Sequence, residues 1–214
     1  MCLSLYMSPE SINPMKKLNM PNLYSDYIGA IVSESIQPKK DLVPFIKKYL
    51  FFQNNNVTNK VQLKLISNAQ LEMHICYDTS CFVINEGKKE FKYNAFISGI
   101  FDLQKPLYYK PMANSGSFKC VTIAFTFSGV YQLLGLDLNS LTNTMVDVQT
   151  IFGRHANELL NKMEETSSID QKVELLNGFF MDRLNEQKKK LLQNIYCSYM
   201  IQLLEIKDVA RLMA

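Results

Sequence analysis

The chain has 214 residues, enough to bury one sizeable hydrophobic core, and its composition of 47% hydrophobic and 20% charged residues is typical of a globular protein. The net charge of +3 is too small to indicate nucleic-acid binding by itself. No apolar run reaches the roughly 18 residues of a membrane-spanning helix, so we expect no contact with a membrane. The N-terminus lacks the pattern of a signal peptide. Five cysteines without a C-x-x-C pair favour reduced thiols and a cytoplasmic protein.

Residues 1–26 show no clear period and are interpreted as an irregular lead-in. About eight short strands follow, with turn residues every 8 to 12 positions or so, which is typical of a β-sandwich or barrel. We expect a jelly roll of the cupin kind. The predicted strands are Tyr27–Ile36, Val61–Ile66, Leu71–Tyr77, Cys81–Ile84, Lys89–Lys92, Ala95–Phe101, Leu107–Lys110 and Cys120–Phe127. Val43–Gln53 could be a further strand or a short helix, and its aromatic residues favour the strand.

The stretch Cys120–Leu136 is the boundary between the predicted strands and the predicted helices. Its first half alternates with period two, as a half-buried strand does. Ser128 is positioned to cap a short helix, and Gly135 supplies the left-handed residue that ends it. The fold class that follows is α+β, with a β-rich N-terminal part and a helical C-terminal part.

After Gly135 the apolar residues recur with the period of a helix. Residues 147–165 form one predicted helix, and a capping box at Ser168–Gln171 starts a second, whose apolar stripe continues to Leu184. We expect the polar run Asn185–Lys190 to be a link. Two more helices are predicted at Leu191–Leu204 and from Ile206 onward. The predicted domain boundaries are 1–26, 27–136, 137–187 and 188–214.

The sequence carries no recognisable catalytic motif. The two histidines, His74 and His155, lie in different halves of the chain, whereas metal sites of cupins need histidines close together. We therefore expect no enzyme, no metal and no cofactor. An alternative is a cupin-like enzyme or a thiol-based sensor centred on His74 and Cys76, because residues i and i+2 share one face of a strand.

The strand half is rich in aromatic residues, which can form a stacking platform for single-stranded nucleic acid, the core of a barrel, or the walls of a small-molecule cavity. For a ligand in the β half, the polar contacts would be Glu72 and His74. The strand Leu71–Tyr77 places these two residues on the face opposite Tyr77, so that both groups can line one cavity only if the strand has a bulge. The candidate apolar walls are Tyr77, Phe101, Tyr108 and Phe125.

The run Phe125–Leu136 resembles a segment in the N-terminal domain of one group of AraC-type transcriptional regulators. Those domains carry Phe-x-Phe/Pro-Gly-Gly followed by Leu-Leu-Gly. Here Ser128 replaces the proline, only Gly129 of the glycine pair is present, and no tryptophan lies near Tyr49–Phe52. The similarity covers roughly residues 40–214 and includes Phe96–Gly99, Pro106, Gly116, Leu141–Asn143, Val146–Asp147, Ile151–Gly153, Glu158–Leu160 and Ser168–Leu184.

The resemblance implies an effector-sensing or dimerisation domain of a bacterial transcription regulator, with a possible small-molecule effector and a possible homodimer. It also implies that Leu191–Leu204 and Ile206–Ala214 begin a helix-turn-helix domain whose recognition helix would follow Ala214. DNA would then be read only through that missing part, and Lys207 and Arg211 would at most contact phosphates.

Overall fold

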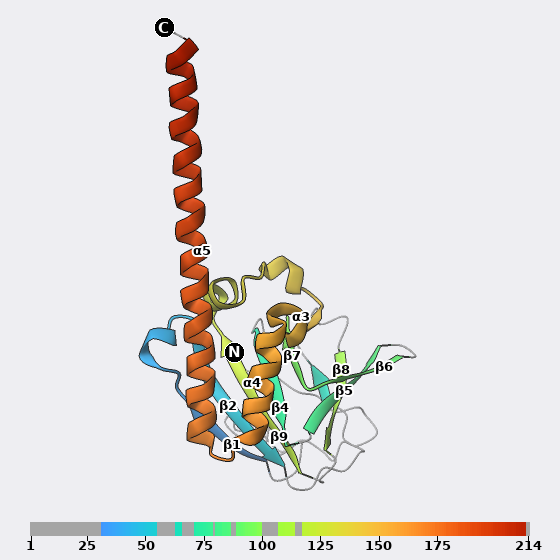
Figure 1. Ribbon diagram of the computed structural model, residues 1–214. Coiled ribbons are helices and arrows are strands. Elements are labelled where there is room, and N and C mark those ends of the chain that lie inside the picture. Colours follow the sequence, from blue (N-terminus) through green and yellow to red (C-terminus); the bar gives the residue numbers. More distant parts are fainter. Residues whose placement is uncertain are drawn as a thin grey trace, which may run out of the picture.

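The strands of the computed structural model form two antiparallel sheets (Figure 1). The structure describes residues 31–54, 63–65, 71–78, 80–86, 89–99, 107–113 and 117–212. The strands are β1 (Ile31–Ile36), β2 (Ile46–Asn54), β3 (Leu63–Leu65), β4 (Glu72–Tyr77), β5 (Ser80–Glu86), β6 (Lys89–Tyr93), β7 (Ala95–Ser98), β8 (Leu107–Ala113), β9 (Phe118–Phe125) and β10 (Met145–Asp147).

The strand order is nested. The six-stranded sheet has the order β1-β2-β9-β4-β7-β10, and the four-stranded sheet has the order β3-β8-β5-β6. Strand β2 pairs with β9, and within the chain segment between them β3 pairs with β8, β4 with β7, and β5 with β6. Successive couples alternate between the two sheets.

The helices are η3 (Lys40–Leu42), α2 (Phe127–Gly129), η4 (Val130–Leu134), η5 (Leu138–Leu141), α3 (Val148–Phe152), α4 (Arg154–Glu165) and α5 (Ile169–Leu212). Most helices follow β9 along the chain, except that η3 lies between β1 and β2, and β10 lies between η5 and α3. Helices α4 and α5 lie across one face of the six-stranded sheet (Figure 1). The prediction of an α+β chain with a β-rich N-terminal part and a helical C-terminal part is confirmed, but β10, which lies among the helices and pairs with β7, was not predicted.

The main core lies between the six-stranded sheet and these helices. Alternate residues of β2, β4, β7 and β9 point into it because side chains of a strand alternate between its two faces. The predicted stripe of α5 enters it from the other side. The fully buried residues of this core include Ile46, Tyr49, Met73, Ile75, Ile97, Val121, Ile123, Leu133, Val148, Met163, Leu176 and Phe180.

The boundary between strands and helices lies where it was predicted, but its cap differs. Thr126, not Ser128, is the N-cap residue of α2, and its hydroxyl oxygen accepts a hydrogen bond from the Gly129 N–H at 3.0 Å. Ser128 lies inside the helix, and its hydroxyl donates to the Pro44 carbonyl instead. Gly135 ends the segment in the left-handed conformation, with φ 68° and ψ 24°, as predicted.

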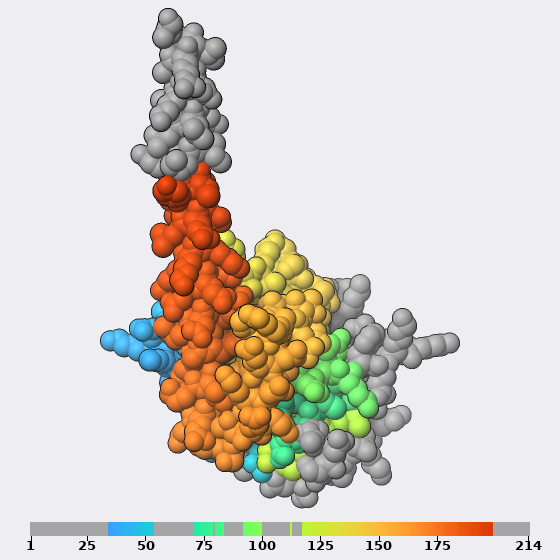
Figure 2. Space-filling view, viewed as in Figure 1, coloured from blue at the N-terminus to red at the C-terminus, as the bar shows by residue number. Residues whose placement is uncertain are grey.

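Helix α5 is continuous over 44 residues, from Ile169 to Leu212. The predicted link at Asn185–Lys190 and the predicted division into helices after it are therefore wrong. The physical reason is that glutamate, glutamine and lysine are good helix formers, and Glu186 lies four residues before Lys190, a spacing that supports a helix. Figures 1 and 2 show α5, orange to red, standing clear of the rest of the molecule beyond its first half.

Some predictions lie outside the described residues. The lead-in 1–26 is among them, as is the start of the first strand, which the structure describes from Ile31. The division of the chain into four domains stays a prediction. Among the residues that the structure describes, no helix combines the length and the hydropathy that crossing a membrane requires.

Candidate functional site

Strand β4 has two faces of different chemistry, although all six of its residues are buried. Met73, Ile75 and Tyr77 belong to the core under the helices. Glu72 and His74 point to the opposite face, toward the four-stranded sheet, where His74 meets Phe82 of β5. The sequence predicted these two faces correctly. We call the side of the six-stranded sheet that faces β5 the inner face, and the side under the helices the outer face.

On the inner face, both ring nitrogens of His74 have hydroxyl partners. Nδ1 lies 2.9 Å from Thr122 Oγ1, and Nε2 lies 3.2 Å from Ser98 Oγ. Thr122 stands directly opposite His74 on β9, while Ser98 comes from β7 on the other side of β4. The direction of each hydrogen bond depends on the tautomer of the imidazole. The ring is thereby fixed between three neighbouring strands.

Glu72 completes this buried polar cluster, which consists of Glu72, His74, Ser98 and Thr122, each at most 6% exposed. Its Oε2 atom lies 3.7 Å from His74 Nε2, beyond hydrogen-bonding distance. Among the residues that the structure describes, this oxygen has no hydrogen-bond partner. A buried polar atom without a partner is uncommon because its desolvation is not compensated.

Burial controls the ionisation of both groups. It raises the pKa of Glu72 to about 8, although Lys48 and Lys47 oppose the shift. It lowers the pKa of His74 to about 3. Near pH 7 the carboxyl group is therefore mainly protonated and the imidazole neutral. A protonated carboxyl can donate one hydrogen bond and accept another, so this arrangement can recognise a polar group of a ligand.

Aromatic rings adjoin the buried polar cluster on the inner face. The His74 ring lies 4.7 Å from that of Phe96, measured between centroids. Phe82 makes edge contacts with Phe96 at 5.3 Å and with Phe118 at 5.1 Å, and thereby joins the two sheets. A few fixed polar groups beside apolar rings are the usual composition of a small-molecule site.

The structure separates the predicted ligand contacts into two groups. Tyr77 and Phe125 belong to the outer-face core, so they cannot line a site with Glu72 and His74. The ring of Phe125 packs edge-on against Phe180 of α5 at 5.7 Å. Phe101 lies outside the described residues, and for Tyr108 the structure describes only its place in β8. One cavity for both groups was expected only if β4 has a bulge. The pairing of β4 with β9 is regular, so Tyr77 and Phe125 do not share a cavity with Glu72 and His74.

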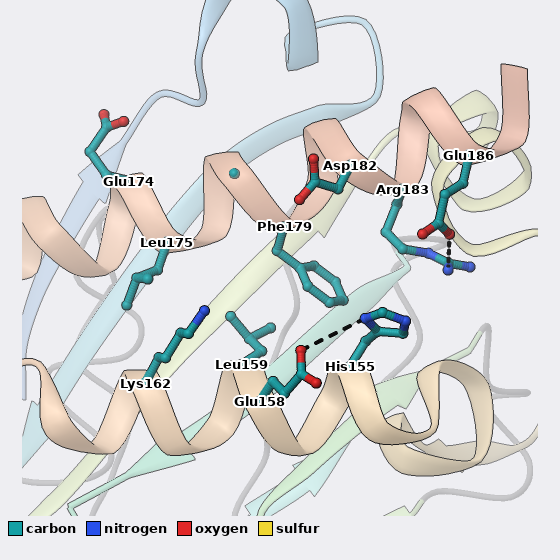
Figure 3. A pocket seen from close by; sticks show the side chains of 11 residues that line it. His155, Glu158, Leu159, Lys162, Glu174, Leu175, Phe179, Asp182, Arg183 and Glu186 are labelled. Carbon is teal, nitrogen blue, oxygen red and sulfur yellow. Dashed lines mark hydrogen bonds and ion pairs between the residues drawn. The ribbon is translucent and has the colours of Figure 1, made fainter. Parts of the chain in front are cut away.

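A groove of about 250 Å³ lies between α4 and α5 on the surface of the molecule (Figure 3). Leu175 and Phe179 of α5 point toward α4 and, together with Leu159 of α4, form its apolar part (Figure 3). Its polar lining consists of His155, Glu158, Lys162, Glu174, Asp182, Arg183 and Glu186. Sequence reasoning did not identify this groove.

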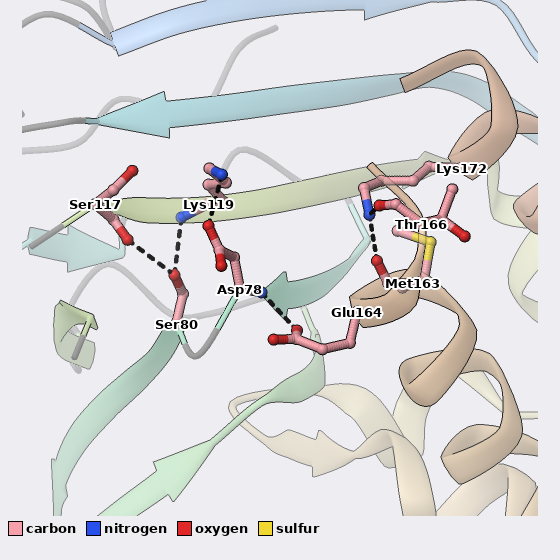
Figure 4. Close-up of polar contacts among 8 residues, drawn as sticks. All are labelled: Asp78, Ser80, Ser117, Lys119, Met163, Glu164, Thr166 and Lys172. Carbon is pink, nitrogen blue, oxygen red and sulfur yellow. Dashed lines mark hydrogen bonds and ion pairs between the residues drawn. The ribbon is translucent and has the colours of Figure 1, made fainter. Parts of the chain in front are cut away.

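A second unpredicted feature is the buried junction at Lys172, a residue that is only 3% exposed (Figure 4). Its Nζ donates hydrogen bonds to the carbonyls of Met163 and Thr166 at the end of α4. The same Nζ lies 4.4 Å from the centroid of the Tyr77 ring. Burial lowers the pKa of this ammonium group. Lys172 therefore connects strand β4 with both long helices.

The turn after β4 is held to the helices as well (Figure 4). The backbone N–H of Asp78 donates to a carboxylate oxygen of Glu164 at 2.5 Å, and the Asp78 carboxylate pairs with Lys119 at 2.5 Å. Asp78 has a positive φ of 58°. These contacts could not be predicted from local sequence patterns because they join residues far apart in the chain.

The thiols near β4 have a setting that opposes reactivity. Cys76 lies directly opposite Cys120 on β9. Burial, the hydrogen bond with Cys120 and the neighbouring thiols hold the pKa of Cys76 well above its usual range. Within the described part of the chain, no group of three or more His, Cys, Asp or Glu residues is arranged to hold a metal ion.

Lys207 and Arg211 lie in the last turns of α5, where the structure describes the helix but not the side chains. Their predicted contacts with DNA phosphates stay a prediction.

Comparison with solved structures gives remote likenesses. They include the hydroxypropylphosphonic acid epoxidase from S. wedmorenis (11% identity, 47% of this chain and 51% of that chain, TM-score 0.33). A second is the plu4264 protein from Photorhabdus luminescens (15% identity, 55% of this chain and 92% of that chain, TM-score 0.34). A third is a Cupin 2 conserved barrel domain protein from Salinispora arenicola CNS-205 (10% identity, 56% of this chain and 94% of that chain, TM-score 0.32). The match spans about half the length of the epoxidase. At these TM-scores and identities, nothing about fold or chemistry follows for this chain.

No curated protein sequence matches the chain. A family model, the domain of unknown function DUF6597, matches residues 34–147, which is more than half of the chain and includes β4, β7 and β9 with the buried polar cluster. The chain therefore belongs to the DUF6597 family.

Proposed function

We propose that this chain is the effector-sensing and dimerisation domain of an AraC-type bacterial transcription regulator, acting in the cytoplasm and without catalytic activity. The observation that carries the proposal is the double role of β4. One face of this strand presents Glu72 and His74 to the inner face, and the other presents Tyr77 to Lys172 of α5. A ligand that contacts the first face is thereby one strand away from the helix that leads toward the C-terminus.

The nested strand order supports a cupin-like jelly roll as the scaffold. In a jelly roll, eight strands pair as four couples that alternate between two facing sheets. The pairing of β2 with β9, β3 with β8, β4 with β7 and β5 with β6, in alternate sheets, supports this scaffold, with β1 and β10 added at the edges of the larger sheet. Small barrels and jelly rolls of this size hold one ligand between their sheets.

The effector site proposed here is the buried polar cluster with its aromatic neighbours. The unpartnered Oε2 atom of Glu72 supports this choice, because a ligand group could supply the missing hydrogen bond. Binding there would change the equilibrium between two packings of β4 against α5, in proportion to the ligand's difference in affinity for them. Tyr77 and Lys172 would carry that change to the helices.

DNA reading belongs, in this proposal, to a recognition helix beyond residue 214, as the resemblance implies. We expect residues 1–214 alone to bind DNA no better than a weak, salt-sensitive polycation. A gel shift at nanomolar protein that depends on DNA sequence would contradict this.

A thermal-shift screen against a library of small metabolites tests the sensing role. We expect at least one compound to raise the melting temperature by several degrees, because a ligand that binds the native state stabilises it. The shift should be lost in Glu72→Leu and kept in Glu34→Leu, an exposed acid on β1. A screen without any shift, or an equal shift in Glu72→Leu, would count against the proposal.

The second candidate is the cupin-like enzyme or thiol-based sensor at His74 and Cys76. The observation that favours a thiol role is the position of Cys76 directly opposite Cys120, with two thiols on neighbouring strands. The raised pKa of Cys76 and the lowered pKa of His74 oppose a thiolate–imidazolium pair. Loss of a peroxide-dependent response in Cys76→Ser, with ligand-induced shifts unchanged, would favour this candidate over the first.

A further inference from the structure

Several large apolar side chains in the described part of the chain are strongly exposed. They are Val43 (49% exposed), Phe127 (54%), Tyr131 (66%), Leu191 (58%), Leu192 (66%), Ile195 (58%) and Tyr196 (64%). The first lies between η3 and β2, the next two on α2 and η4, and the other four on α5. Single exposed apolar residues are ordinary on a protein surface, but a contiguous group of them marks a site where another molecule docks.

The loop that carries Val43 is joined directly to α2. The Ser128 hydroxyl of α2 donates a hydrogen bond to the carbonyl of Pro44 at 3.2 Å. Gly129 lies so close to the same loop that a Cβ atom there would be 1.9 Å from the Phe45 carbonyl oxygen. Only glycine permits this approach of one backbone to another. The loop and α2 therefore form one unit at the rim of the domain.

Phe127 and Tyr131 lie on one side of the segment that begins with α2, because they are four residues apart. On its other side Val130, Leu133 and Leu134 belong to the core. The segment η4 is a π-helix, a rare geometry that occurs frequently at functional sites. A firmly packed backbone thus presents two aromatic rings to solvent, so that a partner has little of this segment to order on binding.

The exposed apolar residues of α5 continue the stripe that is buried in its first half. From Leu184, the last core residue of that stripe, steps of three and four residues lead through Gln187 and Leu191 to Ile195. The side chain of Gln187 lies against Gly135, at the end of η4. At a rise of about 1.5 Å per residue, Leu191 lies about 6 Å beyond this contact and Ile195 about 12 Å beyond it. The exposed stripe therefore starts directly above η4 and faces the same side as the core.

Together these elements form an inside corner, which we call the α5–η4 corner and define by Val43, Phe127, Tyr131, Leu191 and Ile195. One arm is the rim of the domain, and the other is the half of α5 that stands clear of it (Figures 1 and 2). A helix laid in this corner can pack against both arms, whereas a flat lipid bilayer can reach only one of them. The shape of the surface therefore favours a helical partner.

Lysine side chains surround the α5–η4 corner. The segments that build it, residues 37–47, 126–137 and 187–196, contain six lysines, all exposed, but only two acidic residues, Asp41 and Asp137. Their net charge of +4 exceeds the +3 of the whole chain, so the rest of the chain is slightly acidic. The basic character of this protein is thus concentrated around its exposed apolar surface, which calls for an occupant with negative charge beside apolar side chains.

We propose that the α5–η4 corner binds an acidic amphipathic helix of another protein. The apolar stripe of that helix covers Leu191 and Ile195 along α5 and reaches Phe127 and Tyr131 at the rim, while its carboxylates face the lysines. A second copy of this chain would bring the same lysine-rich surface and hence charge of the same sign. Nucleic acid would pair its phosphates with the lysines but would leave the aliphatic side chains of α5 uncovered. The corner is separate from the buried polar cluster, so this inference does not rest on the proposed function.

Peptide binding to the full chain, followed by fluorescence anisotropy, tests the proposal. The probe is a labelled helical peptide of about 18 residues, or five turns, with leucine along one face and glutamate elsewhere. One control peptide has the same composition in scrambled order and so lacks an apolar face, and a second has lysine in place of glutamate. We expect a Kd of about 50 μM or tighter for the probe and at least about tenfold weaker binding of both controls.

Variants of the chain locate the binding surface. Tyr131→Ser and Leu191→Ser each remove an exposed apolar contact, one on each arm of the corner, and each should weaken binding of the probe by about tenfold. Lys188→Glu should weaken it as well, and more strongly at low salt than at high salt. The matched control is Lys162→Glu, an exposed lysine on α4 outside the corner, which should leave the Kd unchanged. Because all four side chains are exposed in part or fully, the melting temperatures should stay close to that of the unmodified chain.

The proposal is overturned if the probe does not bind at about 100 μM, if the scrambled or the lysine peptide binds equally well, or if Tyr131→Ser and Leu191→Ser have no effect. Phosphatidylglycerol vesicles or a single-stranded oligonucleotide that bind through the same residues more tightly than the probe would contradict it too. So would a dimer in sedimentation equilibrium that both serine variants dissociate, because a second copy would then occupy the corner. None of these results bears on the metabolite-induced shift in melting temperature, which tests the sensing role separately.

Discussion

The outer and inner faces of the six-stranded sheet are built by the same strands but have opposite chemistry. The outer face packs Tyr49, Met73 and Ile123 against α4 and α5 without exposure to solvent. The inner face buries Glu72 and His74 among hydroxyl groups and rings, and one carboxyl oxygen there has no hydrogen-bond partner in the described part of the chain.

The outer face provides stability, whereas the inner face holds the groups that are proposed to recognise a ligand. Apolar packing stabilises the domain through the area it removes from water, and it makes no demand on a particular ligand. A buried acid and a buried imidazole each cost free energy, which is acceptable where they have a function. Because β4 contributes to both faces, it is the point where ligand contact on one side can affect packing on the other.

The largest effect should follow from a change on the outer face. Phe180→Ala removes a fully buried ring that contacts Phe125 and Phe179, and we expect the free energy of unfolding to fall by about 3–5 kcal/mol. Urea denaturation followed by circular dichroism measures it. Leu192→Ala, 66% exposed on the projecting half of α5, should stay within about 0.5 kcal/mol in dilute solution. A similar loss in both variants would contradict the assigned core.

The next effect concerns pH on the inner face. Glu72 is protonated in the folded state up to a pKa of about 8, while in the unfolded state its pKa is 4.5. Between these values the folded state binds more protons, so the contribution of Glu72 to stability is present at low pH and is lost as the pH rises. Relative to the unmodified chain, Glu72→Gln should gain roughly 2–4 kcal/mol between pH 4 or so and pH 8 or so.

The pKa shift of His74 changes stability with pH in the opposite direction. Its folded-state pKa of about 3 lies below the ordinary histidine pKa of 6.5, so the unfolded state binds a proton first and stability falls as the pH falls through this range. Urea denaturation of Glu72→Gln and of the unmodified chain, repeated across the pH range, measures the difference between their free energies of unfolding. If the stability difference between Glu72→Gln and the unmodified chain does not change with pH, Glu72 is not buried as described.

A smaller effect is expected where the two faces connect. Lys172→Met keeps an unbranched side chain, one atom shorter, but removes the ammonium group that donates to the Met163 and Thr166 carbonyls and contacts the Tyr77 ring. Loss of these hydrogen bonds should reduce the free energy of unfolding by about 1–3 kcal/mol. Chemical denaturation at pH 7 measures it, with the exposed Lys162→Met as the matched control. The prediction fails if the control loses as much stability.

The smallest effect belongs to a single hydroxyl of the buried polar cluster. Ser98→Ala removes the partner of His74 Nε2, and we expect a loss of about 1 kcal/mol. The nitrogen signals of His74 in an NMR spectrum should shift in this variant. Ser167→Ala, at an exposed position, should change neither quantity. An unchanged His74 spectrum in Ser98→Ala would show that the hydrogen bond is absent.

Much of the local structure could be predicted from the sequence. Alternation in Leu71–Tyr77 identified both faces of β4, and the helical stripe of Val173, Leu176, Phe180 and Leu184 is buried as predicted. Gly135 ends its segment as expected. These features depend on neighbours in the chain, whose spacing the sequence displays directly.

Other features could not be predicted because they depend on long-range register. His74 finds Thr122 and Ser98 only because β9 and β7 pair with β4 at particular residues. Lys172 lies in a helix that begins close to the Tyr77 ring, and nothing in its sequence neighbourhood indicates that contact. Alternation already placed Tyr77 and Glu72 on opposite faces of β4, but which of these faces the helices cover, and hence that Tyr77 and Phe125 belong to the core, depended on the tertiary structure.

The sequence by itself determined the order of strands and helices, the alternation of β4 and the apolar stripe of α5, because short-range periodicity and turn chemistry fix them. Only the tertiary structure decided that Glu72, His74, Ser98 and Thr122 meet, that Lys172 joins β4 to the helices, and that α5 continues to Leu212. Contacts between residues far apart in the chain depend on strand pairing and helix packing, which are set by the free energy of the whole domain rather than of any one segment.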